Sequence, residues 1–344
     1  MNLIYSCVFF QESYIELISI LLKSFVIFGN QSEDTDYLIV CSSDFQERIA
    51  NLFETLGIDG KIWCLEATTM FEAAYTRLKI FNYPQIERYQ KLLYLDCDIL
   101  VTDSVDKVFD LQKQDQLYVL QEQFHRWNHC WFFRESEMHS VCHDDVFTSG
   151  IILFPNSETI KKLFNHILGH IKFHIQNNFQ IPYCLDQPFI VYHAITQQLY
   201  NNVSLATVAI NNPSRFERKS ICHFPTSVGH SQSKRQLMYE YFKYYISSLK
   251  TQNICVRNVE ITNKYTWEND DSYITFLEKG NMDAFGKGKY QFVNEALVVA
   301  EFGNRTHILK FNPTFSTFIS IRRDDLYVVK GSVIRQEDES DCII

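Results

Sequence analysis

Several features typical of particular protein classes are missing from this chain of 344 residues. It has no excess of positive charge, because 41 acidic residues outnumber 32 basic ones and give a formal net charge of -9. Nucleic acids and anionic membranes bind basic surfaces, so neither is an expected partner. No uncharged apolar run is long enough to span a bilayer. The first apolar stretch lacks a basic start and is interrupted by Gln11, Glu12 and Glu16, so we expect no signal peptide.

The ten cysteines form no Cys-x-x-Cys pair. Several fall within apolar, strand-like runs, where a free cysteine behaves as a small hydrophobic residue. This usage favours a reducing compartment without disulfides. Together with the missing signal peptide and membrane span, it predicts a cytoplasmic protein.

What is present is a large hydrophobic content, 46%, in a chain long enough for one large or two modest domains. Residues 1 to about 120 alternate between strand and helix signals. The expected strands are Leu3–Phe9, Tyr37–Cys41, Lys61–Leu65 and Lys91–Leu95. The expected helices between them are Ser13–Phe28, with Ser13 as N-cap, Phe45–Leu56 and Met70–Ile80. Strands separated by helices predict an α/β fold with a mostly parallel sheet.

The pattern continues and then changes along the rest of the chain. The next expected elements are a strand at Gly150–Phe154, helices at Glu158–Gln176 and Asp186–Gln197, a strand at Ile221–Phe224 and a helix at Lys234–Leu249. After residue 250, short alternating runs separated by turn signals predict a small all-β module. We therefore expect a first domain over 1–250, a small β domain over 254–335 and a disordered acidic tail over 336–344.

The most informative motif is Asp96-Cys97-Asp98, which follows the apolar run Lys91–Leu95. This pattern predicts a buried strand that delivers two carboxylates to its carboxyl end, where ligands bind in such sheets. Adjacent carboxylates repel each other unless a positive charge lies between them, and a divalent cation is the usual one. The motif therefore indicates a metal site at the edge of the sheet.

Two kinds of chemistry fit such a pair. In one, the cation bridges the carboxylates and the diphosphate of a nucleotide sugar. In the other, a phosphohydrolase of the haloacid-dehalogenase type, the first Asp attacks phosphate and the second transfers protons. That pattern requires Thr four residues after the first Asp, where this chain has Leu100. A solvated pair at a strand end is the third interpretation.

The surrounding segments resemble glycosyltransferase family 8, the glycogenin and galactosyltransferase group. The resemblance begins with Tyr75–Lys79, Lys91–Asp98 and Val105–Leu111. Three further blocks match in order: Thr148–Phe154, Leu185-Asp186-Gln187, and His223-Phe224 with Gly229 and Lys234 downstream. It covers about residues 1 to 250 and implies a GT-A, Rossmann-like nucleotide-sugar domain.

The resemblance also implies a role for each matching residue. Asp96, Asp98 and His223 would hold Mn²⁺, with Mg²⁺ as the alternative. Asp186 and Gln187 would lie near the anomeric carbon and carry the catalytic role. The substrate-binding residues would be Tyr14, which stacks on uracil, Arg77, Ser149, Gly150, Gly229 and Lys234. The chain departs from the family at Thr148, where an Asn is usual, and in the long spacing from His223 to Lys234.

The implied function is Mn²⁺-dependent transfer of a hexose, glucose or galactose, from a UDP-sugar to a hydroxyl acceptor with retention of configuration. The acceptor would be a glycan or glycoprotein, and the family is compatible with a homodimer. The alternatives are the phosphohydrolase that uses Asp96 and Asp98, and a binding module that keeps the nucleotide-sugar or carbohydrate pocket without turnover.

Two regions have no role in this scheme. Residues 121 to 147 are rich in histidine and aromatic residues, and predict either an acceptor-facing loop or, with spacing that fits no ordinary pattern, zinc ligands. The β module contains Trp267, Tyr273, Phe285 and Tyr290. It is compatible with carbohydrate binding or dimerisation, although most of these side chains are expected in its core.

Overall fold

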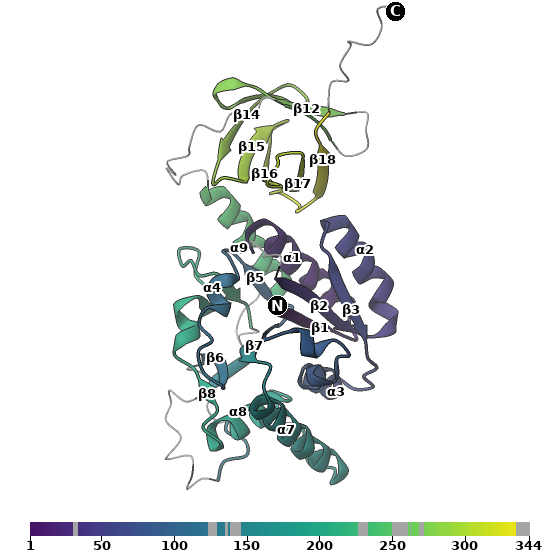
Figure 1. Ribbon diagram of the computed structural model, residues 1–344, viewed down its shortest axis with the longest axis vertical. Helices are drawn as coiled ribbons and strands as arrows, with labels where there is room; N and C mark the ends of the chain where they lie inside the picture. The colour runs from purple at the N-terminus through teal and green to yellow at the C-terminus, as the bar shows by residue number, and fades with distance from the viewer. Residues whose placement is uncertain are drawn as a thin grey trace, which may run out of the picture. The chain divides into compact units, whose positions relative to one another are not determined.

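The computed structural model describes residues 1–29, 34–122, 129–134, 137, 146–225, 233–249, 261, 263–267 and 272–334. The chain divides into two compact units, Met1–Met238 and Tyr239–Ile344. The division falls within one helix, α9, which spans Lys234–Leu249. Each unit is described by itself below (Figure 1).

The first unit is built on a seven-stranded sheet with the order β3-β2-β1-β4-β7-β6-β8. Its strands are β1 (Asn2–Val8), β2 (Thr35–Cys41), β3 (Gly60–Cys64), β4 (Lys91–Leu95), β6 (Leu117–Gln121), β7 (Phe147–Pro155) and β8 (Tyr200–Asn201). Parallel pairing joins β1 to both β2 and β4, and β2 to β3. Strand β7 runs antiparallel to its neighbours β4 and β6. The predicted α/β class with a mostly parallel sheet is therefore confirmed.

Helices cover both faces of this sheet. The α-helices are α1 (Glu12–Phe28), α2 (Gln46–Leu56), α3 (Met70–Tyr75), α4 (Asp106–Phe109), α7 (Glu158–Gln176) and α8 (Gln187–Thr196). Figure 1 shows α1 and α2 on one side of β1 to β3, and α3 on the other. Because β1 is covered on both faces, its residues Leu3 and Ile4 point to opposite sides and are both fully buried.

Helix α7 shows how the sequence specifies such an element. The Ser157 hydroxyl accepts a hydrogen bond from the Ile160 amide and caps the first turn. A buried stripe at helical spacing then faces the core. It comprises Ile160, Leu163, Phe164, Ile167 and Ile171.

Two helix predictions require correction. Ser13 is not an N-cap, because α1 begins at Glu12 and the Ser13 hydroxyl donates to the Gln11 side chain at 3.3 Å. The helix expected over Met70–Ile80 is α-helical only to Tyr75 and continues as a 3₁₀ helix over Thr76–Asn82. This tighter segment contains Arg77, whose side chain is buried.

A small three-stranded sheet lies beside the main sheet and joins distant segments. Its strands are β5 (Ile99–Val101), β9 (Ala209–Asn211) and β10 (Ile221–His223), with β10 in the centre. In this sheet His223 is opposite Ile99 on β5 and opposite Asn211 on β9. The register therefore places His223 next to the Asp98 turn.

The second unit is an eight-stranded antiparallel meander, which confirms the predicted all-β module. Its strands are β11 (Lys264–Thr266), β12 (Tyr273–Phe276), β13 (Asn281–Asp283), β14 (Lys287–Phe292), β15 (Leu297–Phe302), β16 (Arg305–Phe311), β17 (Thr317–Arg322) and β18 (Val328–Ser332). A bridge between Tyr265 and Val333 brings the last strand back to the first. The sheet thus curls into a nearly closed barrel (Figure 1).

The barrel interior is filled by aromatic side chains, among them Tyr265, Phe276, Phe311 and Phe318. Gly331 on β18 is needed for this packing, because a Cβ there would lie 2.3 Å from the Phe318 ring. The predicted acidic tail, 336–344, lies outside the described residues. Within the described chain, no helix combines the length and apolar character that a membrane crossing requires.

Candidate active site

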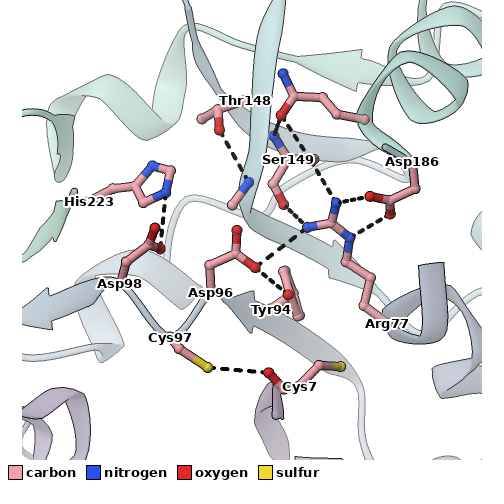
Figure 2. A network of polar contacts seen from close by, with 12 residues as sticks. Cys7, Arg77, Tyr94, Asp96, Cys97, Asp98, Thr148, Ser149, Asp186 and His223 are labelled. Atoms are coloured by element: carbon pink, nitrogen blue, oxygen red, sulfur yellow. Dashed lines mark hydrogen bonds and ion pairs between the residues drawn. The ribbon is translucent and has the colours of Figure 1, made fainter. Parts of the chain in front are cut away.

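The two aspartates of the motif lie immediately beyond the carboxyl end of β4. Strand β4 ends at Leu95, and the Asp96 amide still donates to the Gly150 carbonyl of β7 at 2.9 Å. Cys97 turns away, and its thiol donates to the Cys7 carbonyl on β1 at 3.2 Å. Figure 2 shows Asp96 and Asp98 pointing to the same side of the turn, toward His223.

Asp96, Asp98 and His223 form a group suited to a cation. Each offers one ligand atom, and these atoms all lie within 4.8 Å of one another. His223 Nδ1 lies 2.7 Å from the Asn211 side-chain oxygen. Because an amide oxygen only accepts, Nδ1 carries the proton and Nε2 keeps a free lone pair, 3.4 Å from Asp98 Oδ1.

The chemistry of the donor set also fits a divalent cation. Asp98 Oδ1 is buried and, among the described residues, is a side-chain acceptor without a hydrogen-bond partner. Buried polar atoms are rarely left in this state, so the atom is available to a ligand. Two carboxylates and a neutral imidazole suit Mn²⁺ or a similar ion.

Gly150 makes the close approach of these groups sterically feasible. A Cβ at this position would lie 2.5 Å from His223 Cε1, 2.6 Å from His223 Nε2 and 3.0 Å from Asp96 Oδ2. Any other residue would displace the imidazole ring or the carboxylate. The Gly150 amide donates to Thr148 Oγ1 at 3.2 Å.

The surroundings of the turn shift the pKa values of Asp96 and Asp98 in opposite directions. Burial and the repulsion from Asp98 raise the pKa of Asp96, although Arg77 opposes them. Burial also acts to raise the pKa of Asp98, but the neighbouring His223 and Lys234 outweigh it and hold that pKa below its usual value. Lys234 Nζ donates to Asp98 Oδ2 at 2.5 Å. The Lys234 ammonium group therefore compensates the negative charge of the buried Asp98 carboxylate.

Arg77 and Asp186 form a buried ion pair beside this group. Arg77 Nε and Nη2 donate to the two Asp186 oxygens at 2.8 and 2.6 Å. The same guanidinium donates to the Ser149 carbonyl at 2.7 Å and to the Ser149 hydroxyl at 2.8 Å. Its Nη1 also lies 3.6 Å from Asp96 Oδ1. Figure 2 shows how Arg77 joins the aspartate motif to Asp186.

Asp186 stands at the N-cap position of α8, but its side chain makes no capping hydrogen bond. Both carboxylate oxygens bind Arg77 instead. Burial lowers the pKa of Arg77, but Asp186, Tyr94 and Asp96 outweigh that effect, so the guanidinium stays charged.

Gln187 belongs to a second polar network. Its Oε1 accepts from the Ser149 amide and hydroxyl, both at 3.1 Å. Its Nε2 donates to Glu122 at 3.3 Å and to His129 Nδ1 at 2.5 Å. Sequence reasoning did not assign Glu122 to the site and considered His129 only as a zinc ligand. Nothing in their local sequence links them to Gln187, which lies 58 or more residues away.

These groups line one cavity of about 410 Å³ at the carboxyl edge of the sheet. The cavity walls include eight of the residues that the sequence singled out: Tyr14, Arg77, Asp96, Asp98, Ser149, Asp186, Gln187 and Lys234. Met70, Tyr183, Cys184 and Leu185 contribute further apolar surface. Gly150 and His223 are not among the residues that line the cavity, but both lie next to Asp96, which does. Gly229 lies outside the described residues.

The sequence of this region matches a known family. Residues 50–202 match the sequence model of glycosyl transferase family 8. This part of the first unit is similar in sequence to family 8 glycosyltransferases. The match confirms the resemblance inferred from the ordered motifs, and the chain is an enzyme of the glycosyltransferase class. No curated protein sequence matches the chain.

Several solved glycosyltransferases are similar to this chain at low sequence identity. Galactosyltransferase LgtC, solved with donor and acceptor sugar analogs, is 15% identical over 72% of this chain and 96% of that one, with a TM-score of 0.49. Mouse xyloside xylosyltransferase 1 is 13% identical over 65% of this chain and 98% of that one, with a TM-score of 0.48. The bifunctional glycosyltransferase WbbM is 13% identical over 70% of this chain, which spans 49% of WbbM, with a TM-score of 0.49.

The candidate zinc ligands within residues 121–147 are His125, His129, Cys130, His139, Cys142 and His143, and most of them lie outside the described residues. Only His129 and Cys130 are described, and both are buried. Within the described residues, Asp96, Asp98 and His223 are the one group with metal-ligand geometry.

Proposed function

We propose that this chain transfers a hexose from a UDP-sugar to a hydroxyl acceptor of a glycan or glycoprotein, with Mn²⁺ as cofactor and with retention of configuration. Mg²⁺ is the alternative ion, and glucose or galactose is the transferred sugar. The observation that supports this is the single cavity in which Asp96 and Asp98 lie at one part of the wall and Asp186 and Gln187 at another.

Asp96, Asp98 and His223 would hold the cation. When bound, a divalent cation neutralises the diphosphate and stabilises the departing UDP. Lys234 would pair with the phosphates. Its contact with Asp98 supports this, because it places the ammonium group beside the proposed metal ligands. Tyr14, half-buried on the cavity wall, would stack on the uracil ring.

Asp186 and Gln187 would face the sugar. A carboxylate beside the anomeric carbon stabilises the positive charge that develops as the bond to UDP breaks. Arg77 binds both Asp186 oxygens, so we propose that it holds this carboxylate in position. The Ser149 hydroxyl fixes Gln187, and Gly150 provides the space for the metal group. Gly229 is proposed to contact the donor.

The remaining proposals concern the whole protein. We propose domain limits of 1–250 and 254–335 with a disordered tail over 336–344, and assembly into a homodimer. A cytoplasmic location is supported by the free cysteines of the described chain, which are Cys7, Cys41, Cys64, Cys97, Cys130, Cys184 and Cys222.

Hydrolysis of a panel of UDP-sugars with and without Mn²⁺ tests the proposal. We expect one donor to be hydrolysed, only with the metal. Asp98→Ala should abolish this turnover and metal-dependent UDP binding. Asp110→Ala removes an exposed aspartate at the end of α4 and should change neither.

Two results would contradict the transferase. Hydrolysis of a generic phosphate ester without UDP binding would favour the phosphohydrolase. UDP binding without turnover of any donor, in the presence of acceptor sugars, would favour a non-catalytic module.

A further inference from the structure

One end of the barrel in the second unit contains a cavity lined by aromatic and arginine side chains. In an antiparallel meander, alternate turns lie at the same end. The turns β13–β14, β15–β16 and β17–β18 therefore share one end with Trp267, which directly follows β11. These turns bring aromatic and arginine side chains together around a cavity of about 340 Å³.

The floor of this cavity is aromatic. The rings of Phe302 and His307 stack 4.5 Å apart and only 9° from parallel. Trp267 meets both edge-on, with ring centroids 5.2 Å from each. Burial, with Arg322 and Arg305 nearby, lowers the pKa of His307 to about 4. The imidazole is therefore neutral at pH 7, and its Nδ1 lies 3.3 Å from the Ser320 hydroxyl oxygen.

The rim carries two aromatic rings that are open to solvent. Phe285, in the β13–β14 turn, is 61% exposed, and Tyr327, just before β18, is 46% exposed. Most other large aromatic side chains of this unit are in its core. Exposed aromatic rings beside a cavity provide flat apolar surfaces onto which a sugar ring can pack.

Two arginines and no acidic residue line the cavity. Arg322 is held by Asp325 through two hydrogen bonds of 2.7 and 2.5 Å, and its guanidinium lies over the Tyr327 ring. Arg305 lines the same cavity and is exposed. Among the described residues no ion-pair partner of Arg305 is found. This guanidinium is therefore available to an anion.

A wider groove continues from the cavity along the β15–β16 turn. The groove shares Phe285, Phe302 and Arg305 with the cavity and adds Lys287. Its acidic lining residue is Glu301. The combined surface has the volume of an ordinary ligand site, roughly 300–1,000 Å³, at the mouth of a β-barrel, where such sites are common.

We propose that the mouth of this barrel binds an acidic sugar residue, with the sugar ring packed on Tyr327 or Phe285 and its carboxylate or phosphate group bound by Arg305. Neighbouring sugars of the same glycan would follow the groove past Lys287. This site lies within the second unit and is independent of the transfer reaction proposed for the first.

Titration calorimetry on the full chain tests the proposal with four probes: glucuronic acid, glucose 6-phosphate, glucose and inorganic phosphate. Both acidic sugars should bind about tenfold or more tightly than glucose, because a charge-assisted arginine contact contributes that much. Glucose 6-phosphate should also bind more tightly than inorganic phosphate. Equal binding of glucose and the acidic sugars would overturn the proposal, as would equal binding of inorganic phosphate and glucose 6-phosphate. The carboxylate and phosphate probes identify which anion is preferred.

Two variants and two matched controls locate the site. Arg305→Ala should weaken binding of the acidic sugars about tenfold, and Tyr327→Ala about fivefold. Lys279→Ala, in the turn at the opposite end of the barrel, and Tyr273→Ala, an exposed tyrosine outside the cavity, should leave it unchanged.

Equal effects of variants and controls would refute the assigned location. Arg305→Gln keeps a hydrogen-bonding side chain of similar length, and should lose binding like Arg305→Ala if charge is the cause. Hydrolysis of the UDP-sugar donor should be unaffected by all of these changes. A failure of donor hydrolysis in the unaltered chain would therefore concern only the proposed transferase.

Discussion

Replacing Arg77 by methionine tests the central network of the first unit. The side chain of Arg77 is 7% exposed and that of Asp186 is 2% exposed. The substitution keeps most of the volume and removes four hydrogen bonds, two to Asp186 and two to Ser149. It leaves a buried carboxylate without its cation and a carbonyl without its donor.

The expected cost follows from these two losses. Breaking a buried ion pair on one side costs about 3–5 kcal/mol, and an unpaired buried carbonyl adds about 1 kcal/mol or more. A domain of ordinary stability has only about 5–15 kcal/mol in total. We therefore expect Arg77→Met to fold but to lose at least about 4 kcal/mol of unfolding free energy.

Urea unfolding followed by circular dichroism measures this loss. The matched control is Arg48→Met, because Arg48 forms a two-pronged ion pair with Glu12 in which both side chains are exposed. That pair should contribute at most about 1 kcal/mol. In the double variant Arg77→Met/Asp186→Leu, neither charge of this pair remains, so about half or more of the stability should return.

Two results would refute this reasoning. A loss for Arg77→Met as small as that for Arg48→Met would mean that the buried network contributes little. A double variant less stable than Arg77→Met would mean that the uncompensated carboxylate of Asp186 is not the cause of the loss.

Three further predictions concern other positions. Gly150→Ala should weaken Mn²⁺ binding about tenfold or more while the chain stays folded, because the added Cβ displaces the His223 ring; unchanged affinity in a Mn²⁺ titration would contradict this. Asn211→Leu removes the acceptor that orients His223 and should weaken Mn²⁺ binding about 10–100-fold in the same assay. The third prediction concerns pH. The pKa of His307 is 6.5 in the unfolded chain and about 4 in the folded one, so only the unfolded chain binds a proton there between these values. The free energy of unfolding should therefore fall as the pH drops from 6.5 to 4. The loss should reach up to about 3 kcal/mol, measured by hydrogen exchange of the β16 amides, and should disappear in His307→Gln.

Much of the fold could be predicted from local pattern. Apolar runs of strand length, separated by helical periodicity, predicted the α/β class, and the change to short alternating runs predicted the β module. Errors occurred at element ends, as at Ser13, and where the α-helix tightens to a 3₁₀ helix at Thr76. Helix type and termini depend on a few hydrogen bonds that residue patterning does not specify.

The sequence by itself determined that two carboxylates follow a buried strand, because burial and strand length leave a direct signature in a short segment. It also determined the order of the motifs that mark the family. Only the tertiary structure decided which groups meet: Arg77 with Asp186, 109 residues away, and Lys234 with Asp98, 136 residues away. These partners are set by strand order and by long crossovers, which no local pattern encodes. The same holds for the barrel mouth, where turns remote in sequence meet only because the sheet curls back to its first strand.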